Sequence, residues 1–394
     1  MKAVVIGTGR IACGVAGQLL RDSGFDVVFV GRNADVVNHL NRLGRYIVRI
    51  VDSRKSVDHE VSGIRAVNIS DGETAAMEIA AADIVVTSVG VKNLLDIAPV
   101  VAGGLAFRRH RANVLAFENF GSSGDMLQLF AQRCLQNSNN AHGFSGAVVT
   151  RVVARREGDP LLDEPLVFVA DESKTFYVDG TSLLSPLPAI EGMVITTHHQ
   201  AMVERKLYTF SAGHATAAYL GFLKGYHYIH TAVRDPEVRE AVLSAMREGQ
   251  EALAARYGRE IAGDEHDLQE ILKRFQNAAL SDSIERVGQD PKRKLGSEDR
   301  LMGPARLARK NGLKPEKLML AVAAAMFFAP RADASAAELR KSIHSDGPAA
   351  ALCRAAGVDP NDTLAASAVR AYCRLEKGKP EKSQLLSLDR LLWS

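Results

Sequence analysis

Three polar residues of one predicted helix, Lys206, Ser211 and His214, have side chains suited to acid–base chemistry, and they are spaced five and then three residues apart. This spacing places them near one face of a helix. A lysine whose ammonium group is removed from water has a lowered pKa, so it can exchange a proton with a hydroxyl or carbonyl oxygen. His214 could bind a substrate hydroxyl group, and Ser211 could donate a hydrogen bond to a developing oxyanion. The same spacing is also common on polar helix faces that have no catalytic role.

The sequence GTGRIA near the start of the chain could bind the diphosphate of a dinucleotide. It follows a predicted strand and opens a predicted helix, which is the context that the G-x-G-x-x-G/A fingerprint requires. Gly7 allows the tight turn, Gly9 allows the backbone to approach the phosphates, and Ala12 allows the helix to pack closely on the strand. The first amide groups of the helix, those of Arg10 and Ile11 among them, would then bind the phosphates with the help of the helix dipole.

The residues after the second predicted strand bear on which dinucleotide is bound. NAD-binding proteins usually carry an Asp or Glu there that binds the ribose 2′-hydroxyl group, but this chain has Gly31, Arg32 and Asn33. Arg32 could bind a 2′-phosphate through charge-assisted hydrogen bonds and stack on the adenine. We therefore expect NADP as the cofactor, with Arg32 and Asn33 among the residues that bind it. Val89 and Gly90, which follow a later predicted strand, are also expected to contact the cofactor. NAD is the alternative, because Arg32 could equally be a solvated turn residue.

Five stretches of the sequence, in the same order, are similar to the mannitol dehydrogenase family of polyol-specific long-chain dehydrogenases, and most of all to its mannitol-1-phosphate 5-dehydrogenase branch. They are GTGRIACG, ADIVVTSVGVKNLLDIAPVVA, FENFG, ERKLYTFSAGHATAAYLGFLKGYHYIHTA and RFQNAALSDSIERVGQDPKRKLGSEDRLMGPA. The family signature is Lys-x4-Asn-x2-His, so the resemblance implies that Lys206 is the catalytic acid/base and His214 a substrate contact. It also implies that Asn119 lies near the nicotinamide and the substrate, although Asn119 could instead be a turn residue.

The chain departs from the pattern of this family in three places, the first of which is Ala12 at the third glycine of the fingerprint. The signature Asn, which in the family helps to hold the substrate oxygen, is Ser211 here, and one hydroxyl group lacks the reach and the donors of an amide. The Asp that family members often carry after the second strand is also missing, which agrees with the expectation of NADP. By composition alone, residues 286–300 would form a solvated basic loop. The resemblance implies instead that Lys294 or Arg300 could hold a phosphate or carboxylate group.

Hydrophobic periodicity predicts an α/β fold with two domains. Short β-branched runs alternate with amphipathic helical runs, such as Ala34–Leu43, over about the first 100 residues, which predicts βαβ units in a doubly wound, Rossmann-type sheet. Extended segments between Gly143 and Asp179 are expected to continue this sheet. Helical periodicity follows, as in the predicted helices Ala201–Tyr226 and Pro236–Tyr257. We therefore expect a dinucleotide-binding domain over residues 1–192 and an all-α substrate domain over residues 193–394 that closes the site.

Composition and charge argue against several classes of protein. The 49 basic and 46 acidic residues are scattered along the chain, so nucleic acid is not an expected partner. The longest apolar stretch, residues 318–330, is too short to cross a bilayer, so no membrane association is expected. Four distant cysteines without CxxC spacing favour a reduced, cytoplasmic protein. His230 and the pair His198–His199 lack acidic or sulfur partners at ligand spacing, so no metal site is expected.

Together these inferences predict an NAD(P)-dependent oxidoreductase that interconverts a ketose carbonyl group and a polyol hydroxyl group by hydride transfer. The expected partner is a small-molecule polyol or, by preference, a sugar phosphate, and the expected assembly is a monomer or a small homo-oligomer. Two alternatives stay open. In one, the same fold acts on a sugar acid or a sugar–amine conjugate, as Ser211 suggests. In the other, the chain is a non-catalytic dinucleotide-binding sensor.

Overall fold

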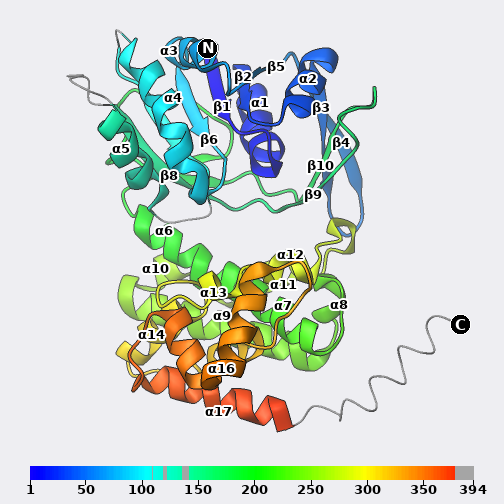
Figure 1. Ribbon diagram of the computed structural model, residues 1–394, viewed down its shortest axis with the longest axis vertical. Coiled ribbons are helices and arrows are strands. Elements are labelled where there is room, and N and C mark those ends of the chain that lie inside the picture. The colour runs from blue at the N-terminus through cyan, green and yellow to red at the C-terminus, as the bar shows by residue number, and fades with distance from the viewer. Residues whose placement is uncertain (109, 119–121, 135–141, 378–394) are drawn as a thin grey trace, which may run out of the picture. The chain divides into compact units, whose positions relative to one another are not determined.

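A computed structural model describes residues 1–108, 110–118, 122–134 and 142–377 of the chain. The chain forms two compact units (Figure 1). Unit 1 comprises Met1–Lys206 together with Asn277–Ser281, and unit 2 comprises Leu207–Gln276 together with the chain from Asp282 onward. Unit 1 therefore extends past residue 192 and includes a short segment from the helical half of the sequence.

Unit 1 is built around an eight-stranded sheet with the strand order β12-β11-β8-β7-β6-β1-β2-β5. Its strands are β1 (Lys2–Ile6), β2 (Asp26–Gly31), β5 (Arg65–Asn68), β6 (Ile84–Thr87), β7 (Asn113–Ala116), β8 (Gly143–Val149), β11 (Phe176–Asp179) and β12 (Met193–Thr196). The strands from β5 to β8 are parallel, with Val4 opposite Val28 and Val85, and β11 is antiparallel to β8. If the six parallel strands are numbered along the chain, their order across the sheet from β5 to β8 is 3-2-1-4-5-6. This is the Rossmann order. The predicted fold class is confirmed.

Side chains on both faces of the parallel strands are buried. In β1, Ala3 and Val5 enter one core while Val4 and Ile6 enter another, because successive side chains of a strand point to opposite faces. The helices that cover the first core are the one over residues 10–22 and α2 (Ala34–Leu43), and those that cover the second are α3 (Gly72–Ala80), α4 (Leu94–Ala106) and α5 (Ser123–Cys134) (Figure 1). Helices on both faces explain why these strands are almost continuously apolar in sequence.

Four further strands of unit 1 form a separate sheet with the order β4-β3-β10-β9. They are β3 (Arg45–Val51), β4 (Ser56–Ser62), β9 (Val153–Glu157) and β10 (Val167–Ala170). The prediction that the extended segments between Gly143 and Asp179 continue the main sheet is therefore wrong for β9 and β10. The physical reason is that β10 pairs in parallel with β3, a strand that the sequence analysis did not identify. This sheet packs against the helix over residues 10–22, since Tyr46 and Phe168 share a buried core with Cys13.

Unit 2 is helical and surrounds one large buried core. Its helices are α7 (Ala212–Leu223), α8 (Ile229–Ala232), α9 (Pro236–Tyr257), α10 (Arg259–Ala262), α11 (Glu265–Phe275), α12 (Ile284–Gly288), α13 (Pro291–Lys294), α14 (Met302–Lys310), α15 (Glu316–Ala325), α16 (Ala334–Ala356) and α17 (Thr363–Lys377). Local signals set the ends of α9, because Asp235 caps its first amide groups, Pro236 occupies its first position and Gly258 follows its last. Among the described residues, no helix is both long enough and apolar enough to cross a membrane.

Candidate active site

The turn that follows β1 has the backbone geometry of a phosphate cradle. Gly7 has a φ of 124°, and a Cβ atom there would lie 2.2 Å from the carbonyl oxygen of Ser88, so this position excludes a side chain. Gly9 is exposed, and a Cβ atom there would meet no atom within 4 Å, so the space beside it is open to a ligand. The first amide groups of the helix over residues 10–22 follow directly. These residues fit the diphosphate of a dinucleotide.

The side chains of Arg10 and Ile11 are engaged inside unit 1. The Arg10 guanidinium group donates a hydrogen bond to the carbonyl oxygen of Ala154 in β9, at 2.8 Å, and Ile11 packs against the core beneath the helix. Their predicted role as cofactor contacts therefore concerns their backbone amide groups, which lie at the start of the helix.

The helix after the glycine turn is widened. Ala12–Gly17 (η1) is a π-helical turn and is followed by α1 (Gln18–Asp22). Two donors from outside the helix bind its carbonyl groups: the Tyr46 hydroxyl group binds the oxygen of Cys13 at 2.9 Å, and the Arg151 guanidinium group binds the oxygen of Gly14 at 3.0 Å. A Cβ atom at Gly14 would lie 2.9 Å from the methyl groups of Val153 in β9. The four-stranded sheet therefore supports the helix that begins at the cofactor turn, a contact that the sequence analysis missed.

Arg32 and Asn33 follow β2, as predicted, but their side chains have different surroundings. The side-chain oxygen of Asn33 accepts a hydrogen bond from the Val36 amide at 3.0 Å and so caps α2. Gly31 is closed in, because a Cβ atom there would lie 2.7 Å from a methyl group of Thr8. Arg32 is exposed. Asn33 thus serves as a helix cap, and Arg32 is the neighbouring side chain that could reach a group on the adenosine ribose.

Glu118 is a buried carboxylate that binds the loop after β6, and the sequence analysis missed it. Its two oxygens accept hydrogen bonds from the amide groups of Val89 at 2.8 Å and Gly90 at 2.7 Å. Burial raises the pKa of Glu118, and these hydrogen bonds act in the opposite direction. Val89 and Gly90, both predicted cofactor contacts, are thus held in place by this carboxylate. The signal in the sequence was an acidic residue two positions after the buried strand β7. The neighbouring residue Asn119, which was predicted to lie near the nicotinamide, is outside the described residues.

Lys206 is the last residue of α6 (His199–Lys206) and is half-buried. The chain continues through a π-helical turn, η3 (Leu207–Ser211), into α7. The regular helix expected over residues 201–226 is therefore interrupted between Lys206 and His214, where hydrogen bonds to the fifth residue replace those to the fourth. Ser211 is buried at the end of this wider turn, and His214 lies in the first turn of α7. Lys206, Ser211 and His214 therefore lie at different angles around the helix axis from those in a regular α-helix.

A glycine in α9 accommodates this π-helical turn within unit 2. A Cβ atom at Gly249 would lie only 2.0 Å from the carbonyl oxygen of Tyr208. Glycine in the interior of a helix is unfavourable by about 1 kcal/mol relative to alanine, so its presence there usually has a packing reason. Here the reason is the close approach of η3 to α9.

His214 lies in a polar and aromatic cluster within unit 2. Its ring stacks on Phe275, with the ring centres 4.8 Å apart, and meets the edge of Phe210. Its Nε2 atom lies 3.1 Å from Oδ2 of Asp282. Asp282 also accepts two hydrogen bonds, each 2.6 Å long, from the guanidinium group of Arg286. Asp282 was not predicted from the sequence, although it belongs to one of the stretches that resemble the family.

The charges of this cluster oppose one another. Burial lowers the pKa of His214, although the hydrogen bond with Asp282 acts in the other direction. Burial also disfavours the ionised form of Asp282, but the hydrogen bond from His214 and the charge of Arg286 hold the pKa of this carboxyl group below its ordinary value. The cluster therefore holds an ionised carboxylate beside a histidine ring that is neutral at neutral pH.

Two buried cations, Lys294 and Arg300, lie in the same unit. Burial, together with the nearby charges of Arg300 and Arg293, holds the pKa of Lys294 well below its ordinary value. The Lys294 ammonium group donates a hydrogen bond to the carbonyl oxygen of Val287. Arg300 is bound to Asp299 through its Nε atom at 2.6 Å. Its Nη2 atom is buried, and no described residue provides a hydrogen-bond partner for it. The Nη2 atom of Arg300 can therefore donate a hydrogen bond to an anionic or carbonyl oxygen of a ligand.

Two family models account for most of the chain. The mannitol dehydrogenase Rossmann domain matches residues 1–192, and the mannitol dehydrogenase C-terminal domain matches residues 198–376. The protein belongs to the mannitol dehydrogenase family. It is therefore an oxidoreductase of the polyol dehydrogenase class, as the resemblance of its sequence motifs implied.

Several solved structures have a fold similar to that of this chain. The ternary complex of Pseudomonas fluorescens mannitol 2-dehydrogenase with NAD and D-mannitol has a TM-score of 0.78 at 17% identity, covering 100% of this chain and 94% of that one. D-sorbitol dehydrogenase in its substrate-free form has a TM-score of 0.66 at 16% identity, covering 83% of this chain and 80% of that one. D-mandelate dehydrogenase with NADH is less similar, with a TM-score of 0.50 at 12% identity over 82% of this chain and 97% of that one.

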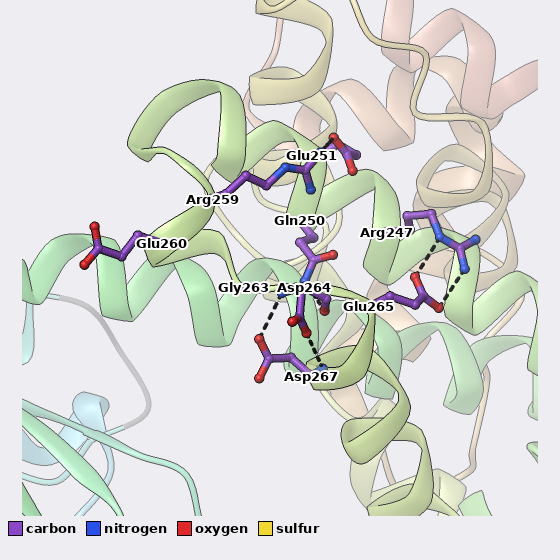
Figure 2. Close-up of a pocket in the computed structure, with 9 residues that line it drawn as sticks. All are labelled: Arg247, Gln250, Glu251, Arg259, Glu260, Gly263, Asp264, Glu265 and Asp267. Atoms are coloured by element: carbon purple, nitrogen blue, oxygen red, sulfur yellow. Dashed lines mark hydrogen bonds and ion pairs between the residues drawn. The ribbon is translucent and has the colours of Figure 1, made fainter.

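A polar hollow of about 770 Å³ in unit 2 holds none of the residues of the family signature. It is lined by Arg247, Gln250, Glu251, Arg259, Glu260, Gly263, Asp264, Glu265 and Asp267. Figure 2 shows that its two arginines point toward acidic neighbours, Arg247 toward Glu265 and Arg259 toward Glu251. We therefore do not assign the reaction to it. Over the described residues, no group of three or more His, Cys, Asp and Glu side chains is arranged to hold a metal ion.

Proposed function

We propose that the protein is an NADP-dependent oxidoreductase that interconverts the carbonyl group of a ketose phosphate and the matching hydroxyl group of a polyol phosphate. The observation that carries this proposal is the glycine cradle at Gly7 and Gly9 in a chain of the mannitol dehydrogenase family. The cofactor, when bound, takes up or returns the hydride. Proteins of similar fold that bind NAD or NADH support a nicotinamide dinucleotide.

Lys206 is the proposed general acid/base. During oxidation its amine takes the proton of the substrate hydroxyl group while the hydride leaves the same carbon atom, and during reduction its ammonium group returns that proton. Ser211 donates a hydrogen bond to the substrate oxygen as negative charge develops, and Asn119 is proposed to do the same. His214 binds a neighbouring hydroxyl group. Because the Ser211 hydroxyl group is shorter than the Asn of the family signature, we expect a substrate selectivity that differs from the usual one.

The proposal of a phosphorylated substrate rests on the two buried cations. Arg300 has a buried Nη2 atom that lacks a partner among the described residues, and Lys294 is buried beside it with a carbonyl group as its acceptor. A phosphate group would supply acceptors to both in a charge-assisted arrangement. The same two cations favour a second candidate, the carboxylate of a sugar acid. Rates of NADPH oxidation with fructose 6-phosphate, with unphosphorylated ketoses and with keto sugar acids distinguish these substrates.

The test of the proposed chemistry is the variant Lys206→Ala, with Lys310→Ala as its control. Lys310 is an exposed lysine at the end of α14, in unit 2. We expect Lys206→Ala to lose turnover by at least a hundredfold, as is typical when a general acid/base is removed, while its affinity for the cofactor changes little. The control should keep both. Full activity of Lys206→Ala would refute its role, and cofactor binding without turnover in the wild-type protein on the whole panel would favour a non-catalytic sensor.

A further inference from the structure

The contact between His214 and Asp282 determines which ring nitrogen of the histidine carries hydrogen. Asp282 is ionised because its oxygens accept two hydrogen bonds from Arg286, and an ionised carboxylate can only accept hydrogen bonds. His214 Nε2 lies 3.1 Å from this carboxylate, so Nε2 must be the nitrogen that donates. In a neutral imidazole ring the other nitrogen, Nδ1, then carries a lone pair and accepts.

The surroundings of His214 favour the neutral ring. Phe275 and Phe210 cover it with apolar surface, which disfavours an added charge. The charged groups that act on the ring are Asp282, Arg286 and Lys294. Of these, the carboxylate is paired with Arg286, so it is only partly available to stabilise a protonated ring. The burial that lowers the pKa of His214 therefore leaves one hydrogen on the ring at neutral pH.

We propose that Asp282 is a positioning residue that fixes His214 with its hydrogen on Nε2, so that Nδ1 accepts a hydrogen bond from a hydroxyl group of the substrate. Because Nε2 is engaged with Asp282, Nδ1 is the ring nitrogen that we assign to a ligand. The inference rests on the proposed function where it assigns His214 to substrate binding. The tautomer itself depends on the local geometry alone.

This assignment restricts the chemical class of the substrate at one position. A lone pair on Nδ1 attracts an O–H group and repels the oxygens of a phosphate or carboxylate. The group bound by His214 is therefore a hydroxyl group, and the anionic group of the substrate binds elsewhere, at Lys294 and Arg300. A substrate analogue that lacks the hydroxyl group would lose the contribution of His214.

Nuclear magnetic resonance of protein labelled with 15N in its histidines tests the tautomer directly. Neutral rings with hydrogen on Nε2 or on Nδ1 give different nitrogen shifts and couplings, and the His214 signal among the eleven histidines is the one lost in His214→Gln. We expect hydrogen on Nε2 in the wild-type protein at pH 7. We expect a population with hydrogen on Nδ1 in Asp282→Asn, because the charged acceptor is gone. Asp362→Asn is the control, since Asp362 also pairs with an arginine in unit 2 but caps α17.

A kinetic measurement links the tautomer to the substrate. We expect Asp282→Asn to lower kcat/KM about tenfold for a substrate that carries the hydroxyl group, with little change for its deoxy analogue and in cofactor affinity. A wild-type ring with hydrogen on Nδ1, or an unchanged spectrum in Asp282→Asn, would overturn the proposal even if the enzyme reduces ketoses. Failure of the proposed function would appear differently, as absent turnover with the tautomer as expected. The wild-type spectrum decides the point if Asp282→Asn does not fold.

Discussion

Replacing Arg32 with Ala should remove the preference for NADPH and leave the use of NADH nearly unchanged. Arg32 is exposed at the end of β2, Asn33 is engaged in capping α2, and Gly31 has no space for a side chain, so Arg32 is the group at this corner that a 2′-phosphate would meet. Hydrogen bonds to a charged group contribute about 1.5–3 kcal/mol. Solvent screening at an exposed position reduces this to about 1–2 kcal/mol, or roughly 5- to 30-fold in kcat/KM.

The assay compares kcat/KM for NADPH and NADH at one saturating substrate concentration, in the wild-type protein and in Arg32→Ala. We expect the ratio to fall toward one in the variant, through a rise in KM for NADPH. The preference should also shrink as the salt concentration increases, because the proposed contact is exposed. A wild-type protein that prefers NADH, or a variant that keeps its preference for NADPH, would refute the assignment of Arg32.

Three substitutions probe a buried hydrogen bond, a close backbone contact and an ion pair of the structure. Glu118→Gln should lower the thermal midpoint and weaken cofactor binding severalfold, because an amide cannot accept both backbone hydrogen bonds of the loop after β6, at a cost of about 1–3 kcal/mol. Gly249→Ala should destabilise the fold by about 1–3 kcal/mol, because its Cβ atom would lie 2.0 Å from the oxygen of Tyr208, whereas Gly72→Ala, which meets no atom within 4 Å, should not. The hydrogen bond from Lys224 lowers the pKa of Asp235 from 3.8 to about 2, so its stabilising effect is present above pH 4 and is lost as the pH falls toward 2. Asp235→Asn should therefore flatten the acid side of a urea-unfolding profile by about 1 kcal/mol after screening, and a profile as steep as that of the wild-type protein would contradict this.

Elements with strong local signals could be predicted from the sequence almost residue by residue. The predicted helices at Ala34–Leu43 and Pro236–Tyr257 have the same bounds in the structure, where they are α2 and α9. Each begins after a side chain that caps its first amide groups, and each buries one apolar face. The turn at Gly7 could be predicted for the same reason, since its backbone geometry depends on a few adjacent residues.

Features that depend on contacts between distant residues could not be predicted. The separation of β9 and β10 from the main sheet follows from the pairing of β10 with β3, more than a hundred residues earlier in the chain. The π-helical turn η1 accompanies donors from Tyr46 and Arg151, and η3 accompanies the close approach of Gly249. Nothing in the local periodicity of either helix indicates these contacts.

The residues of the candidate site also differ in whether the sequence could identify them. Lys206, Ser211 and His214 could be selected because they fall within one short motif. Asp282 could not, because its contact with His214 depends on how α7 and α12 pack in unit 2. Glu118 was missed as well, since the loop that it binds lies some thirty residues earlier in the chain. A motif therefore identifies the residues that we propose to carry the chemistry, and the fold identifies residues that contact them.

Transfer of an isotopically labelled hydride tests the proposed reaction most directly. Purified protein is given NADPH carrying deuterium at the transferable position of the nicotinamide, together with fructose 6-phosphate, and the polyol product is analysed by mass spectrometry. We expect a polyol phosphate with one deuterium atom bound to the carbon of the former carbonyl group. A polyol product without deuterium from either labelled face of the cofactor, or no product from any ketose or ketose phosphate, would contradict it.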